Sequence, residues 1–256
     1  NTRSAIYASS KNVDSGVDLH LNNVKFERVS QYSVYNSSSI GSVDVDNSVF
    51  SNSNGNCIFA PDVNVRVTNS SFLKNHGGFE IIYTSSDLCE MIYLDNISVS
   101  GCSSNFVQSY GDLIIKNSSF DSNEFNSFIT QYSAPEYKFH ISNTSITNNK
   151  TKGSYFLYSY STDNVTIDSC LIDHNESASY LGYFSSMKMT DSKVSNNSTP
   201  TELFYVNKMT DFVGDTISNN KSTCLLKSYG GISIDSCIVN DNESYLIYSQ
   251  SGDPYS

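Results

Sequence analysis

The chain has 256 residues, of which 38% are hydrophobic and only 16% are charged, and its formal net charge at pH 7 is −11. This acidic balance argues against a nucleic-acid or anionic-membrane surface, because such surfaces require clustered Lys and Arg. No apolar run approaches the roughly 20 residues that a membrane-spanning helix needs, so we expect neither a nucleic-acid partner nor a membrane span in this segment.

One unit of 21 to 27 residues recurs along the chain, and each unit contains one apolar residue that we call the anchor. The ten anchors are Phe26, Phe50, Phe72, Val99, Phe120, Ile146, Ile172, Val194, Ile217 and Val239. Alternating apolar residues lie seven and five positions before the anchor, as in Val65 and Val67 before Phe72, and predict a strand with one inward face. A polar corner separates this strand from the anchor, and another apolar run follows seven to twelve residues after the anchor.

A period in the low twenties, with short β-type runs and no helical periodicity, is typical of a parallel β-helix with three short strands per turn. Ten such turns predict a rod about 48 Å long at the usual strand spacing. Because the chain starts without Met and opens directly into the repeat, we expect residues 1–256 to form a single domain that is a segment of a longer protein. We also expect open ends that favour pairing with another chain.

Two positions near the anchor carry a restricted set of residues. The residue two before the anchor is small in most units, as in Ser48, Ser70, Ser118, Thr144, Cys170, Ser192 and Cys237, which predicts a narrow interior there. The residue three after the anchor is asparagine in seven units, namely Asn75, Asn123, Asn149, Asn175, Asn197, Asn220 and Asn242. Stacked turns would join these amides in a column, as in the asparagine ladders of other stacked sheets.

Two motifs resemble those of a known family. The segments 72–75 (FLKN) and 120–123 (FDSN) match the pattern FxxN, and the segments 77–81 (GGFEI) and 230–232 (GGI) approximate GGA[ILV]. With these motifs the chain resembles the polymorphic membrane proteins of chlamydiae and similar repeat proteins of protist surfaces, and the alternative is the wider pectin-lyase-like superfamily. The resemblance implies a right-handed β-helix displayed at a cell surface, often with an adhesive role, and it implies no catalytic residue.

Polysaccharide cleavage is the enzymatic alternative, because many parallel β-helices act on acidic glycans. An inverting hydrolase needs carboxylates roughly 6.5 to 9.5 Å apart in one groove. The best candidate group in this chain comprises Asp168, Asp173, His174 and Asp191. Asp168 and Asp191 occupy corner positions, where Asp is an ordinary turn residue. We therefore interpret the group as turn and surface residues and predict no catalytic site.

Metal and disulfide sites are not indicated by the spacing of His and Cys. The four histidines show no paired ligand spacing, and the six cysteines lack any CxxC motif. We expect no cofactor and no metal. Cys170 and Cys237 share an inward position but lie three turns apart, which is too far for a disulfide. Cys89 and Cys102 are the pair for which a disulfide remains open.

Tyrosines recur eleven or twelve residues after their anchors, at Tyr83, Tyr110, Tyr132, Tyr158, Tyr183, Tyr205 and Tyr229. One interpretation is a column on an outer face that binds protein chains or stacks on glycans, because tyrosine combines a large contact area with a polar tip. The other interpretation is that these residues only cover the flank of a sheet.

Twelve Asn-x-Ser/Thr sequons occur, but five of them are ladder asparagines, and we expect those to be buried and unmodified. The asparagines three positions before their anchors are expected to point outward. The candidate acceptors are therefore Asn69, Asn96, Asn117 and Asn143, together with Asn36 and Asn164.

The repeated structure without a concentration of reactive groups favours a non-enzymatic, extracellular or cell-surface β-helix. It would act in adhesion or as a structural component of a surface or filament assembly, with other protein chains or cell-surface glycans as partners and with end-to-end or lateral self-association. A glycan hydrolase or lyase of pectin-lyase-like fold is the alternative.

Overall fold

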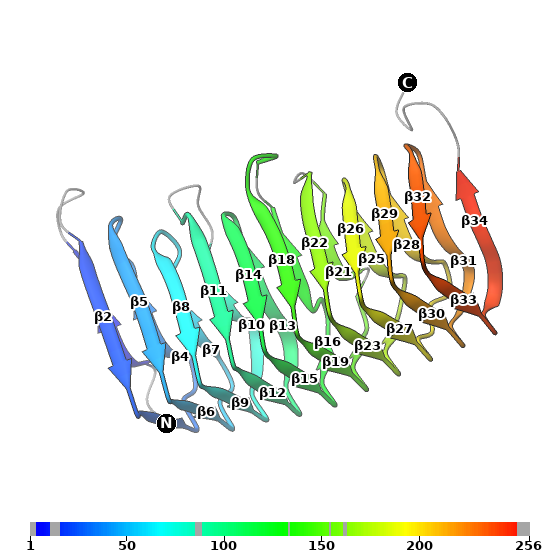
Figure 1. Cartoon of the computed structure of the whole chain (residues 1–256). Coiled ribbons are helices and arrows are strands. Elements are labelled where there is room, and N and C mark those ends of the chain that lie inside the picture. Colours follow the sequence, from blue (N-terminus) through cyan, green and yellow to red (C-terminus); the bar gives the residue numbers. More distant parts are fainter. Residues whose placement is uncertain are drawn as a thin grey trace.

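The computed structural model describes residues 4–10, 16–84, 89–132, 134–153, 155–160 and 163–249, and these residues form a rod of stacked turns built from three parallel sheets (Figure 1). The described residues contain no helix long and apolar enough to cross a membrane. Each turn contributes a strand to each sheet, so the predicted parallel β-helix of about ten turns with three strands per turn is confirmed.

We name the sheets A, B and C. Sheet A contains β1 (Ser4–Ala8), β4 (Tyr32–Asn36), β7 (Asn56–Phe59), β10 (His76–Tyr83), β13 (Ser103–Ser109), β16 (Glu124–Phe125), β17 (Ile129–Gln131), β20 (Lys150–Thr151), β21 (Tyr155–Ser159), β24 (Glu176–Ser177), β25 (Tyr180–Phe184), β28 (Glu202–Val206), β31 (Lys221–Ser228) and β34 (Glu243–Ser249).

Sheet B contains β2 (Val17–Asn22), β5 (Gly41–Asp46), β8 (Asn64–Thr68), β11 (Met91–Asp95), β14 (Asp112–Lys116), β18 (Lys138–Ser142), β22 (Asn164–Asp168), β26 (Met187–Thr190), β29 (Thr210–Val213) and β32 (Ile232–Asp235). Sheet C contains β3 (Lys25–Glu27), β6 (Val49–Ser51), β9 (Ser71–Leu73), β12 (Ser98–Ser100), β15 (Ser119–Asp121), β19 (Ser145–Thr147), β23 (Leu171–Asp173), β27 (Lys193–Ser195), β30 (Thr216–Ser218) and β33 (Ile238–Asn240).

The anchors lie at the centre of the strands of sheet C and form the predicted interior column. Phe72, Val99 and Phe120 are direct register partners, and all anchors from Phe26 to Ile217 are buried. The prediction is wrong for the last anchor, because Val239 is 37% exposed. The reason is that β33 is the final strand of sheet C among the described residues, and no other strand of these residues covers its inner face.

Two left-handed residues bend the chain in every turn. They stand three positions before and two positions after the anchor, as in Asn143 (φ 48°) and Asn148 (φ 56°) around Ile146. The first corner separates sheet B from sheet C, and the second separates sheet C from sheet A. Asn, Asp, Ser and Gly dominate both corners, because these residues tolerate left-handed backbone angles. The second corner also holds Arg28, Lys74 and His174, so His174 is a corner residue of the repeat.

A ladder of small hydroxyl side chains lines the interior at the first corner. The Oγ of Ser118 accepts a hydrogen bond from the backbone N–H of Ile97 in the preceding turn. It also donates to the backbone carbonyl of Lys116 in its own turn. Ser48, Ser70, Thr144 and Ser192 repeat this pattern. Small residues at this position therefore have two causes. The interior is narrow there, and the hydroxyl accepts a hydrogen bond from a buried backbone N–H that the corner would otherwise leave unpaired.

The predicted asparagine ladder stands at the second corner. Asn149 donates from Nδ2 to the carbonyl of Phe120 and to Oδ1 of Asn175, and its own Oδ1 accepts from the backbone N–H of Asn123. Six of the seven predicted members are buried, and Asn242 at the last turn is half-buried. Ser53 and Cys102 occupy the same position in other turns and accept the equivalent backbone N–H groups. The ladder is confirmed.

All six cysteines are free thiols. Cys89 and Cys102 are each buried, and no disulfide joins them, because Cys102 fills a ladder position where its sulfur lies against the carbonyl of Phe72. Burial raises the pKa of the Cys102 and Cys170 thiols to about 11. Both thiols are therefore neutral and poorly reactive at physiological pH.

Candidate functional site

The four residues of the predicted catalytic candidate group do not share one groove, because they lie at two different corners. Asp168 ends β22 at the first corner, where its carboxylate accepts from the hydroxyl of Thr190, and Asp191 is the left-handed residue of the next turn. Asp173 ends β23 at the second corner and accepts from Nδ1 of His174 at 2.6 Å. Across the described residues, no three His, Cys, Asp or Glu side chains are arranged to hold a metal ion.

Asp173 belongs to a repeated arrangement that links successive turns. Its Oδ1 accepts from the hydroxyl of Ser195 at 2.6 Å and from Nδ2 of Asn196 at 2.8 Å, both in the next turn. Asp46 and Asp121 accept the same two kinds of donor from the turns that follow them. These carboxylates therefore act as clamps between turns.

The clamps keep the aspartates ionised. Hydrogen bonds from the next turn lower the pKa of Asp46 and of Asp121. Burial acts to raise the pKa of Asp173, but the hydrogen bonds from Ser195, Asn196 and His174 outweigh it and lower the pKa. A general acid in glycan hydrolysis needs a raised pKa, so these three groups suit a structural role better than that chemistry.

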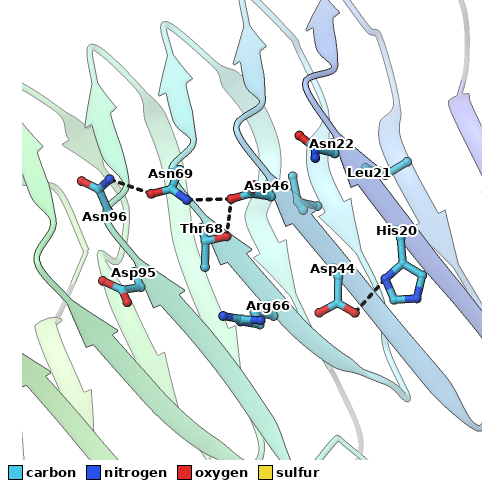
Figure 2. Close-up of a pocket in the computed structure, with 11 residues that line it drawn as sticks. His20, Leu21, Asn22, Asp44, Asp46, Arg66, Thr68, Asn69, Asp95 and Asn96 are labelled. Carbon is cyan, nitrogen blue, oxygen red and sulfur yellow. Dashed lines mark hydrogen bonds and ion pairs between the residues drawn. The ribbon is translucent and has the colours of Figure 1, made fainter.

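A polar pocket that the sequence did not reveal lies on the outer face of sheet B, across β2, β5, β8 and β11 (Figure 2). Its volume is about 490 Å³, and its polar lining consists of His20, Asn22, Asp44, Asp46, Arg66, Thr68, Asn69, Asp95 and Asn96. The lining residues lie up to 76 positions apart in the chain, from His20 to Asn96, and only the register of the stacked strands brings them together.

Arg66 is the cation at the centre of the polar pocket. Its guanidinium lies 5.6 Å from the ring centroid of Tyr93, while His20 pairs with Asp44 at 3.1 Å. Within the described part of the chain, the guanidinium of Arg66 makes no hydrogen bond or ion pair besides this ring contact, whereas its backbone pairs with β5 and β11 in sheet B. A ligand at this site would meet a planar set of N–H donors from Arg66 and the carboxylate acceptors of Asp44 and Asp95, which is a suitable lining for a group rich in hydroxyls or for a carboxylate.

A second candidate site is the outer face of sheet A, which carries nearly all tyrosines. We call this surface the tyrosine face, and its aromatic members are Tyr7, Tyr32, Tyr35, Phe59, Tyr83, Tyr110, Tyr132, Tyr155, Tyr158, Tyr160, Tyr180, Tyr183, Tyr205, Tyr229, Tyr245 and Tyr248. Of the 18 tyrosines in the chain, the others are Tyr93 on sheet B, Tyr137 in a turn and Tyr255, which lies outside the described residues.

Strand register defines the central column of the tyrosine face. Tyr158, Tyr183 and Tyr205 are direct partners on β21, β25 and β28, and Tyr83 occupies the same position on β10. Three members of the predicted column lie outside this register position. Tyr110, Tyr132 and Tyr229 each follow this register position by two residues, because Gln108, Thr130 and Lys227 occupy it. Their rings nevertheless join the column. The ring centroid of Tyr132 lies 5.7 Å from those of Tyr110 and Tyr158, and the ring centroid of Tyr229 lies 5.6 Å from that of Tyr205.

Stacking within the column decides which chemistry the rings present. The ring centroids of Tyr183 and Tyr205 are 4.7 Å apart, and the two rings are nearly parallel with an interplanar angle of 4°. A second stack contains Tyr7, Tyr35, Phe59 and Tyr83. Each ring face inside a stack is covered by its neighbour, so the stacked rings present their edges rather than their faces. The column is therefore less suited to stacking on sugar rings than to contact with a flat, partly apolar surface.

The sequon asparagines differ in exposure. Asn69, Asn96, Asn117 and Asn143 are exposed, as predicted, and Asn164 is exposed as well. The prediction is wrong for Asn36, whose side chain is fully buried. The Asn36 Nδ2 donates to the carbonyl of Val17 at 3.0 Å, and its Oδ1 accepts from Ser38, because Asn36 ends the sheet A strand β4 on its inward side.

The three parallel sheets around one apolar column define the class of protein as an all-β solenoid. A family model described as "Right handed beta helix region" matches residues 33–181, which is more than half of the chain, so the chain belongs to the right-handed β-helix family. A comparison with curated proteins finds no match.

Proposed function

We propose that this chain is a non-enzymatic, extracellular β-helix that acts in cell-surface adhesion or in a surface assembly, with the tyrosine face as its contact surface. The observation that carries the proposal is the concentration of tyrosines on one face of a rigid rod. Tyrosine is enriched at binding surfaces, because its ring supplies a large contact area with few rotatable bonds and its hydroxyl supplies a hydrogen bond.

Two further observations support an extracellular location and a surface role. The FxxN motifs of residues 72–75 and 120–123 resemble those of surface-displayed repeat proteins, and in both motifs the final asparagine belongs to the buried ladder. Exposed sequons such as Asn69 and Asn143 are compatible with secretion through a glycosylating pathway.

A cell-binding measurement tests the adhesive role. The fluorescently labelled chain is expected to bind cultured eukaryotic cells, and the variant Tyr158→Ser/Tyr183→Ser/Tyr205→Ser is expected to lose most of this binding. Ile114, which faces outward on β14 of sheet B, provides the matched control Ile114→Ser, which should bind like the wild type. Pretreating the cells with protease or with glycosidase distinguishes a protein partner from a glycan. Equal binding by the wild type and the triple variant would refute the assigned surface.

A polysaccharide-active enzyme is the second candidate function, and the polar pocket of sheet B is the observation that favours it. Arg66 and the carboxylates of Asp44 and Asp95 line one open site. The test is turnover of polygalacturonate and related acidic glycans, with and without Ca²⁺, by the wild type and by the variants Asp44→Asn and Asp173→Asn. We expect no turnover. Activity that either substitution abolishes would replace the adhesive proposal.

A further inference from the structure

We propose that the tyrosine face binds the same face of a second copy of the chain, so that two rods associate side by side about a twofold axis. This inference rests on the proposed function, because it takes the tyrosine face as the contact surface and specifies what covers it.

The charge distribution favours a second copy as the partner. The strands of sheet A carry five glutamates, and four of these pair with lysines at the same face, as in Glu176 with Lys150 at 2.9 Å and Glu202 with Lys227 at 3.4 Å. The other pairs are Glu124 with Lys152 and Glu243 with Lys221. Glu80 is the remaining glutamate of these strands and is buried. The tyrosine face is therefore nearly neutral, although the chain carries a net charge of −11.

This neutrality matters because two identical acidic molecules repel each other wherever their charged faces meet. Clamp aspartates and exposed acids occupy the outer sides of sheets B and C, for example Asp46 and Asp121. Two copies that meet through sheet A keep these charges apart. A strongly basic partner would instead be drawn to the acidic faces, so the neutral face is better matched by another neutral surface.

The size of the tyrosine face is sufficient for a stable dimer. Eleven consecutive strands, from β1 to β34, form its main path, which gives a length of about 50 Å at the usual strand spacing. The outward positions from Tyr155 to Tyr160 span five residues, or about 17 Å. The resulting area of about 850 Å² per copy is close to the roughly 800 Å² per partner of a standard stable interface.

The chemistry of the face also suits contact with itself. Tyrosine rings in mutual contact line the rod, and Lys227 lies 5.3 Å from the ring centroid of Tyr205 and 5.8 Å from that of Tyr229. Hydroxyls both donate and accept hydrogen bonds, so one such surface is complementary to its own copy. A twofold contact of this kind uses the same patch on both molecules and closes without forming a fibre.

Sedimentation equilibrium tests the dimer. The wild type is expected to show twice the 28.3 kDa chain mass at micromolar concentration. Tyr183→Asp places a charge at the centre of the face and should raise the dimer dissociation constant by at least about tenfold. The milder Tyr183→Ser should act in the same direction, and the matched control Ile114→Asp on sheet B should dissociate like the wild type. Circular dichroism of each variant checks that the fold is retained.

Two further measurements separate the alternatives. Raising the salt concentration should leave the dimer intact or strengthen it, because salt screens the repulsion between two acidic chains. Val239→Asp probes the end of the described rod, where this anchor is 37% exposed. Dissociation by Val239→Asp but not by Tyr183→Asp would mean end-to-end association and would overturn the proposal. A wild type that stays monomeric at high concentration would also overturn it. If this monomer still binds cells through its tyrosines, the proposed function stands, whereas loss of cell binding alone leaves the dimer in place.

Discussion

Asp215 is a buried carboxylate whose ionisation should lower the stability of the fold at neutral pH. It occupies the position two before the anchor Ile217, where other turns carry the hydroxyl ladder, and its side chain is only 1% exposed. Its two carboxylate oxygens accept from the backbone N–H groups of Ser192 at 2.8 Å and Val213 at 3.0 Å. Burial nevertheless dominates and raises the pKa of Asp215 to about 6 from an ordinary value of 3.8.

The sign of the effect follows from this shift. An acid whose pKa is higher in the folded than in the unfolded state stabilises the fold fully at pH values below 3.8, and this contribution is lost as the pH rises through about 6. A shift of two units corresponds to about 3 kcal/mol, of which about 2 kcal/mol falls between pH 4.5 and pH 7.5. The wild type therefore carries an unfavourable buried charge at neutral pH.

The substitution Asp215→Ser restores the side chain that Ser192 supplies in the preceding turn. The hydroxyl can accept the backbone N–H of Ser192, but the bond to Val213 is lost, at a cost of about 1 kcal/mol. We expect the variant to be more stable than the wild type by about 1 to 2 kcal/mol at pH 7.5 and no more stable at pH 4.5. Denaturant unfolding of both proteins at both pH values measures these differences, and Asp191→Ser at the exposed corner is the control. If wild type and Asp215→Ser have the same pH dependence between 4.5 and 7.5, the assigned burial of this carboxylate is wrong.

Three other predictions follow from burial and hydrogen bonding. Phe120→Ala should lower the free energy of unfolding by about 3 to 5 kcal/mol, because this anchor is fully buried; a loss within 0.5 kcal/mol, measured by thermal unfolding, would contradict the register. Asn149→Ala should cost at least about 2 kcal/mol, since it leaves buried ladder groups unpaired, and Asn242→Ala should cost less in the same denaturant titration because Asn242 is half-buried. In a chain expressed in a eukaryotic secretory pathway, glycopeptide mapping should find Asn36 and Asn149 bare and glycans on exposed sequons such as Asn143. Glycans on the ladder would contradict its inward position.

The repeat was predictable from sequence because its physical cause is local. Each anchor fills the interior of its own turn, and each ladder asparagine bonds the buried backbone groups at its own corner. The spacing between Phe120 and Asn123 is therefore informative without any knowledge of distant contacts. The fate of Val239 was not predictable in this way, because its exposure depends on whether another turn covers it. The second left-handed corner was not predictable for a different reason, since residues as unlike as Lys74, Ser122 and His174 occupy it.

The candidate sites were predicted only in part, because they depend on register between turns. The length of each connection decides whether a tyrosine lands in the central column, as Tyr158 does, or two positions beyond it, as Tyr132 does. The polar pocket joins Arg66 to side chains one or two turns away, and no local pattern marks such a group. A sequon likewise records only three residues, so the motif at Asn36 does not reveal that its side chain is buried.

The fixed spacing of the two corners determines how this protein can change in length. The two left-handed residues are five positions apart in every turn, whereas the connection from the second corner to the next first corner varies from 16 residues (Gly101 to Asn117) to 22 residues (Lys74 to Asn96). An insertion between the corners would turn inward side chains outward. Insertions beside sheet A and sheet B, or duplication of a whole turn, preserve both ladders. Related chains can therefore differ in the number of turns and in the length of the connections beside sheets A and B while they keep the same core.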